Sequence, residues 1–204
     1  MSDQVFPGYL RITQVLDWFK EPAYWEWLLR VGKKEARRVG TIAKKIGTNV
    51  DEVIKAKILA KPAPQLKTVE AANCLNAWDR WLKEYVPIDL KVADRVFDEV
   101  LKVTGEPDIL LPDTVLDIKT SNKIRPIYWL QTEFYARQLH LPYKAILRLN
   151  KNLGDYQYER RPISDDDWEV CLSLIKAYRF FNPAVQDTAE REVEDGSTIT
   201  DSKE

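Results

Sequence analysis

The chain has 204 residues, of which 45% are hydrophobic and 31% are charged, a composition typical of one globular domain. It has no run of about 18 apolar residues and no basic segment leading into an apolar stretch at its start, so neither a membrane span nor a signal peptide is expected. Net charge is −1, with seven acidic and two basic residues in 184–204, which leaves +4 on residues 1–183. That balance alone does not indicate a nucleic-acid-binding protein.

The first 93 residues predict mainly helices. Thr13 is a candidate cap for the first helix, and Pro22 separates it from the next. Asn49 or Asp51 is expected to open a further helix, because side chains of this type cap helix starts. Residues 69–86 form a strongly amphipathic helical pattern. The sequence therefore predicts several short helices in this part of the chain.

The periodicity changes after residue 93 to short segments rich in Val, Ile and Leu, divided by turn residues, which predict strands. The expected strands and helices are strands in 95–105, 108–111, 114–120, 142–150 and 156–163, and helices at 127–139 and 165–181. Pro112-Asp113 predicts a hairpin turn, and Ser164 is a candidate helix cap. The pattern predicts a single domain over 1–183, with a helical region (1–93) and an α/β core (94–183). The acidic tail, 184–204, is expected to be disordered.

Cysteine and histidine usage limits the metal chemistry. Cys74 and Cys171 lie in helix-like apolar patterns and are expected to be buried free thiols. Two cysteines cannot supply a four-thiolate zinc or iron–sulfur site within one chain. The single histidine, His140, follows a predicted helix and is expected to have a local structural role.

Three polar residues stand out among the predicted strands. Asp117 and Lys119 are two positions apart, so both side chains leave the same face of their strand, and Ile118 points the other way. Asp108 begins the preceding strand of the same hairpin, which can bring its carboxylate beside Asp117. Two adjacent carboxylates stay ionised only beside a cation, and Mg²⁺ suits this oxygen-rich environment. Alternatively, Asp108 ends a turn, and the other two form the wet face of an edge strand.

A longer ordered pattern bears on this choice. The chain contains Glu99, then Gly105-Glu106-Pro107-Asp108, then Asp117-Ile118-Lys119-Thr120, then Gln131 and Tyr135 on one helix face. This series resembles the RecB-type branch of the PD-(D/E)XK nuclease superfamily. The resemblance implies a restriction-endonuclease-like core, in which a mixed central sheet is flanked by helices. It also implies that Gln131 and Tyr135 position DNA or the active-site strand.

The same resemblance implies a metal site and a catalytic lysine. Asp108, Asp117 and the Ile118 carbonyl are expected to bind Mg²⁺, with Mn²⁺ also supporting activity, and Lys119 is the expected catalytic lysine. Glu99 is expected either to be a further metal ligand or to have a structural role. The expected function is a metal-dependent deoxyribonuclease in viral or recombination and repair DNA processing, located in the cytoplasm (of the host cell for a viral protein).

The chain departs from the family pattern in one important position. Many RecB-type nucleases carry a metal-binding histidine on an upstream helix, a few residues after a glycine. By this spacing Gly40 leads to Lys44, and no histidine precedes residue 140. Glu35 and Glu70 are candidate substitutes. The alternative function is therefore a catalytically inactive, nuclease-like subunit that binds DNA or has a structural role, and a tryptophan-rich assembly protein is a third.

The expected partner is DNA, either single- or double-stranded, and a homo-oligomer also stays open. Between residues 30 and 45 lie seven basic residues and one acidic residue. Such a run ordinarily forms a solvated helix face, but with a nuclease in view it is also a candidate surface for DNA phosphates. The candidate DNA-contacting residues are Lys33, Lys34, Arg37, Arg38 and Lys44. Whether the enzyme would be an exonuclease or an endonuclease is left open by these motifs.

Overall fold

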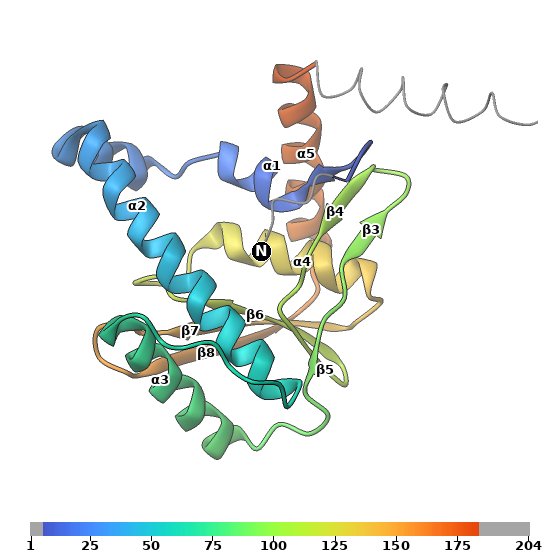
Figure 1. The fold of residues 1–204 in the computed structure, drawn as a ribbon. Coiled ribbons are helices and arrows are strands. Elements are labelled where there is room, and N and C mark those ends of the chain that lie inside the picture. The colour runs from blue at the N-terminus through green and yellow to red at the C-terminus, as the bar shows by residue number, and fades with distance from the viewer. Residues whose placement is uncertain (1–5, 184–204) are drawn as a thin grey trace, which may run out of the picture.

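The computed structural model describes residues 6–183, in which five helices and eight strands occur (Figure 1). The helices are α1 (Ile12–Trp18), α2 (Pro22–Ile58), α3 (Val69–Tyr85), α4 (Pro126–Gln138) and α5 (Asp165–Phe181). The strands are β1 (Leu10–Arg11), β2 (Lys91–Val92), β3 (Val96–Asp98), β4 (Val103–Gly105), β5 (Ile109–Leu111), β6 (Thr114–Lys119), β7 (Tyr143–Leu149) and β8 (Tyr156–Pro162). The predicted acidic tail lies outside the described residues.

The strands form two sheets. The larger has the order β2-β5-β6-β7-β8, and only its β6–β7 pair is parallel. The smaller has the order β1-β4-β3. The predicted hairpin joins β5 to β6, with Leu111 opposite Thr114 across the Pro112-Asp113 turn. Helix α4 then provides the crossover that a parallel connection to β7 requires.

Helices cover both faces of the larger sheet (Figure 1). Leu116 and Ile118 of β6 pack with residues of α2 and α3, while Val115 packs with residues of α1, α4 and α5. Since side chains alternate along a strand, Asp117 and Lys119 leave the sheet on the same side as Val115, toward α4. The mixed α/β fold is confirmed, although β1 and β2 lie within the region predicted to be helical.

Helix α2 differs from the prediction. One helix runs from Pro22 to Ile58, interrupted only at Gly32, where a positive φ of 79° and a ψ of 157° break the regular backbone. Asn49 and Asp51 therefore lie in the helix interior, and their prediction as caps was wrong. Asn49 instead accepts a hydrogen bond from the Lys67 N–H and donates one to the Gln65 carbonyl. No proline follows Pro22 within this segment to end the helix.

Two other caps were tested by the structure. Arg11, not Thr13, is the N-cap of α1, so that prediction was wrong. Ser164 caps α5 as predicted, accepting a hydrogen bond from the Asp167 N–H at 3.4 Å. Cys74 and Cys171 are buried free thiols, also as predicted. Within residues 6–183, no helix is long and apolar enough to cross a membrane.

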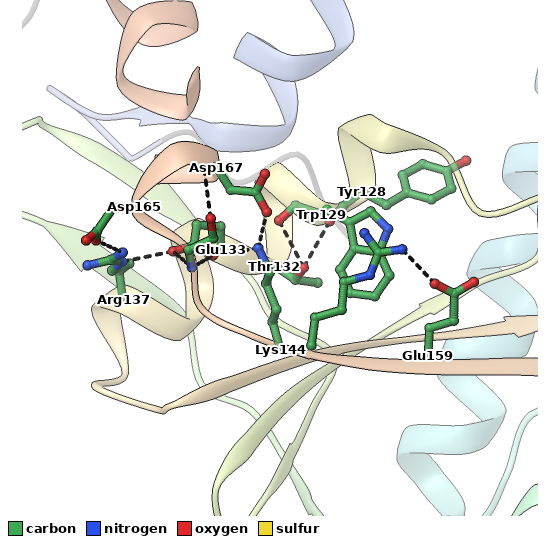
Figure 2. Close-up of polar contacts among 11 residues, drawn as sticks. Tyr128, Trp129, Thr132, Glu133, Arg137, Lys144, Glu159, Asp165 and Asp167 are labelled. Carbon is green, nitrogen blue, oxygen red and sulfur yellow. Dashed lines mark hydrogen bonds and ion pairs between the residues drawn. The ribbon is translucent and has the colours of Figure 1, made fainter. Parts of the chain in front are cut away.

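A buried ion-pair network fastens α4 and α5 to the sheet (Figure 2). Lys144 Nζ of β7 lies 2.6 Å from Glu133 Oε2 of α4 and 2.5 Å from Asp167 Oδ2 of α5. The Lys144 and Glu133 side chains are only 1% and 0% exposed. Arg137 extends the network, with Nε 2.9 Å from Glu133 Oε1. Helix α4 is thereby held in a fixed position over β6 and β7.

Candidate active site

A cavity of about 420 Å³ opens at the carboxyl end of β6, between the Gly105–Asp108 turn, α2 and α4. Its acidic lining residues are Asp51, Glu106, Asp108 and Asp117, and its basic ones are Arg11, Lys55, Arg95, Lys119 and Lys151. The cavity therefore collects both the predicted catalytic residues and charged groups from four other parts of the chain, at Arg11, at Asp51 and Lys55, at Arg95 and at Lys151.

Asp108, Asp117 and Lys119 meet in this cavity as their spacing predicts. The Ile118 N–H donates to Asp108 Oδ2 at 2.7 Å, which ties the turn to β6. Asp117 Oδ2 lies 2.6 Å from Lys119 Nζ. Asp117 is only 1% exposed and β6 lies between β5 and β7, so the alternative of a wet face on an edge strand was wrong. Helix α4 covers this part of β6.

Gln131 and Tyr135 of α4 cover the site and form hydrogen bonds there. Lys119 Nζ donates to Gln131 Oε1 at 3.1 Å, and Gln131 Nε2 lies 3.2 Å from Asp117 Oδ1. Gln131 Nε2 also donates to the Tyr135 hydroxyl at 2.9 Å. One amide thus contacts the acid and the lysine together, so it can fix their relative orientation. Tyr128, one turn earlier, has its ring centre 5.0 Å from Lys119 Nζ, within cation–π range.

Gly105 is required by close packing. A Cβ atom at this position would lie 2.3 Å from Tyr135 Cε1 and 2.9 Å from Ile12 Cγ2. Such distances are far below van der Waals contact, so only glycine lets the Tyr135 ring pass beneath the turn. The packing of the Tyr135 ring therefore requires a glycine at position 105.

Helix α2 contributes two residues that the sequence reasoning did not select for the site. Asp51 and Lys55 lie one turn apart, with Lys55 Nζ 3.1 Å from Asp51 Oδ1. Lys55 Nζ also lies 3.9 Å from both Glu106 Oε1 and Asp108 Oδ1. Asp51 follows Gly47 by four residues, the spacing applied earlier to Gly40. The same spacing therefore applies to Gly47 and Asp51, and these two residues line the cavity.

Burial and crowding shift the titration of these groups. Burial raises the pKa of Asp117 to about 7 against the opposing effect of the Lys119 ammonium, and the Asp108 carboxylate adds to the rise. Burial also raises the pKa of Asp51 to about 6, again with a contribution from Asp108. For Lys119, burial favours the neutral amine, but the Asp117 and Asp108 carboxylates outweigh it and raise its pKa.

The structure does not bring every candidate residue to the cavity. Glu99 lies in the β3–β4 turn, hydrogen-bonded to Tyr9 and 3.2 Å from Lys102 Nζ, a position that argues for the structural alternative. Glu106, not Glu99, is the glutamate that lines the cavity. Lys44 and Glu70 are exposed outside it, and Glu35 pairs with Arg38 on the surface of α2. Of the acidic residues of α2, Asp51 lines the cavity.

The basic candidates lie on the exposed surface of α2. Lys33, Lys34, Arg37 and Arg38 follow the break at Gly32 and are all exposed. Arg38 is partly neutralised, because its guanidinium lies 2.6 Å from Glu35 Oε1. This exposure agrees with both alternatives for the basic run, a solvated helix face and a surface that contacts DNA.

No family model matches the sequence, and no curated protein matches it significantly. Solved structures do match. An alkaline exonuclease from Laribacter hongkongensis has a TM-score of 0.53 and 13% identity, over 95% of both chains. The chain has the fold of this exonuclease. Its structure with dAMP matches at a TM-score of 0.52, 12% identity and the same coverage. A phage-related exonuclease from Haemophilus somnus matches at 0.45, with 14% identity over 94% of this chain and 98% of that one.

The donor set fits a hard divalent cation. Asp117 Oδ2 and Asp51 Oδ1 are buried, and each lies beside a lysine ammonium, Lys119 at 2.6 Å and Lys55 at 3.1 Å. Carboxylate and carbonyl oxygens are what Mg²⁺ and Mn²⁺ bind. In residues 6–183, no group of three or more acidic, histidine or cysteine side chains is already arranged around one metal position. Lys55 and Lys119 instead balance the carboxylate charges.

Proposed function

We propose that the protein is a metal-dependent deoxyribonuclease that hydrolyses phosphodiester bonds of DNA, using Mg²⁺ or Mn²⁺. The observation that carries this proposal is the meeting of Asp108, Asp117 and Lys119 under Gln131 in one cavity. Buried carboxylates beside a lysine are expensive to assemble unless a charged ligand or substrate uses them.

Each residue has a role in this proposal. Asp108, Asp117 and the Ile118 carbonyl would hold the metal, with Asp51 and Glu106 adding negative charge around it. When bound, the metal would supply Lewis-acid stabilisation of phosphate charge and a more acidic water. Lys119 has a raised pKa, so it stays protonated and can neutralise charge on a phosphate oxygen. Gln131 keeps this ammonium beside Asp117.

The fold comparison supports the proposal by analogy. The Laribacter protein is an alkaline exonuclease, and it was crystallised with dAMP, a deoxynucleotide. The exposed basic residues of α2, Lys33, Lys34, Arg37 and Arg38 among them, would add phosphate contacts outside the cavity. A role in viral or recombination and repair DNA processing belongs to the same proposal.

The test compares wild type with Lys119→Ala on linear and circular DNA, single- and double-stranded, with Mg²⁺, Mn²⁺ or EDTA. We expect cleavage by wild type with either metal, none with EDTA, and none by the variant. Cleavage of circular substrates would identify an endonuclease, and its absence would identify an exonuclease. Full activity of a folded Lys119→Ala protein would contradict the assigned role.

One observation favours the inactive alternative, in which the chain binds DNA without cutting it. Lys55 Nζ already lies within 3.9 Å of Asp51, Glu106 and Asp108, where it provides positive charge without a metal. Calorimetric titration with Mg²⁺ separates the two functions. An absence of metal binding together with retained DNA binding would favour the inactive subunit.

A further inference from the structure

The parallel strands β6 and β7 end side by side at the cavity. Lys119 on β6 pairs in register with Arg148 on β7, so the next residues of both strands leave the sheet at the same edge. Ligands of α/β proteins bind at the carboxyl ends of such strands. Beyond β6 the chain supplies Thr120 to the cavity, and beyond β7 it supplies Lys151.

The hairpin that carries Lys151 is held in place by side chains. Asn150 Oδ1 accepts hydrogen bonds from the Asn152 and Leu153 N–H groups at 3.0 and 3.3 Å. From α3, Asn73 Nδ2 donates to the Lys151 carbonyl at 2.9 Å and lies 3.3 Å from the Asn152 carbonyl. The backbone of Lys151 is therefore fixed between β7 and α3.

Lys151 differs from its neighbours in charge pairing. Lys55, Arg95 and Lys119 each lie within 3.1 Å of a carboxylate oxygen of another cavity residue. Across residues 6–183, no carboxylate oxygen lies within ion-pair distance of the partly buried Lys151. An ammonium held at the edge of an acidic cavity without a partner is available to an anion that enters it.

We propose that Lys151 is a positioning residue that binds a backbone phosphate of the DNA strand next to the phosphate cleaved beside Asp117 and Lys119. The inference rests on the proposed nuclease function and adds a contact on the β7–β8 hairpin. It also explains how a polyanion approaches a cavity lined by four acidic residues, because Lys151 offers positive charge that no carboxylate within residues 6–183 pairs with.

The test measures DNA binding in a Lys119→Ala background with Mg²⁺, so that the labelled duplex and single strand stay intact. Fluorescence anisotropy over a salt series gives the slope of log affinity against log salt. Lys151→Ala is expected to reduce this slope by roughly 0.7 to 0.9, the amount for one phosphate contact. Lys151→Arg should keep the slope, and Lys83→Ala, which changes an exposed lysine on α3 outside the cavity, should leave it unchanged.

Cleavage by otherwise wild-type protein provides a second measurement. Lys151→Ala should raise KM roughly tenfold with little change in kcat, since it removes a charge-assisted contact made before and during reaction. Asn73→Ala frees the hairpin but keeps the charge, so KM should rise while the salt slope is retained.

The outcomes separate this inference from the proposed function. If wild type cleaves DNA, Lys119→Ala does not, and Lys151→Ala equals wild type in both KM and salt slope, only the role of Lys151 is wrong. If wild type neither binds nor cleaves DNA, the proposed function and this inference both fail. Equal melting temperatures for Lys151→Ala and wild type would show that the changes do not come from misfolding.

Discussion

The contact between Gly105 and Tyr135 leads to a specific prediction. In Gly105→Ala, the new Cβ would lie 2.3 Å from Tyr135 Cε1, whereas carbon atoms normally stay about 3.5–4.0 Å apart. The ring must therefore move by more than about 1 Å, at a cost of about 1–3 kcal/mol for an overpacked core site. Each kcal/mol should lower Tm by about 2–4 °C in a domain of this size.

The same displacement should reach the candidate active site. Tyr135 accepts a hydrogen bond from Gln131, whose amide contacts both Asp117 and Lys119. A shift of about 1 Å in such a constellation can cost about 100-fold in rate, so cleavage should fall further than stability does.

Urea unfolding and a nuclease assay test both effects. The matched control is Gly40→Ala in α2, where a Cβ would meet nothing within 4 Å. It should stabilise the protein by about 0.5–1 kcal/mol, because it lies in a helix interior. If Gly105→Ala unfolds at the same urea concentration as wild type and cleaves DNA equally well, steric exclusion by Tyr135 is not the reason for the glycine.

Three further predictions concern the charged groups. Lys144→Met leaves the fully buried Glu133 without its ammonium partner and should cost about 3–5 kcal/mol in urea unfolding; a loss under about 1 kcal/mol would contradict the structural role of this pair. The raised pKa values of Asp117 and Asp51 mean that the folded, metal-free protein binds protons that the unfolded chain releases, so its stability should fall as pH rises from about 4 to 7. Mg²⁺ should consequently raise Tm more at pH 8 than at pH 5, and equal shifts would argue against metal binding by these acids. Asp51→Asn should weaken calorimetric Mg²⁺ binding roughly tenfold or more, and unchanged affinity would remove Asp51 from the site.

Much of the fold and part of the site could be predicted because local patterns determine them. The alternation along 114–119 places Asp117 and Lys119 on one face, and helical spacing does the same for Gln131 and Tyr135. The continuity of α2 could not be predicted in this way. Asn49 resembles a helix cap locally, but its side chain is used by the distant 65–67 segment, a tertiary contact that local sequence does not reveal.

The sequence did not identify Asp51 as a site residue for a related reason. Gly40 and Gly47 in α2 each precede a charged residue by four positions. Only tertiary packing distinguishes them: a Cβ at Gly47 would lie 3.3 Å from Thr120 Oγ1, just after β6, whereas a Cβ at Gly40 would meet nothing within 4 Å. In the cavity, Asp51 adds a negative charge close to the Asp108 and Asp117 carboxylates. Lys55, one turn further along α2, lies beside that charge and reaches toward Glu106 and Asp108. Asp51 and Lys55 therefore reach the cavity together, as an acidic group and its counter-charge that the local sequence of α2 does not single out.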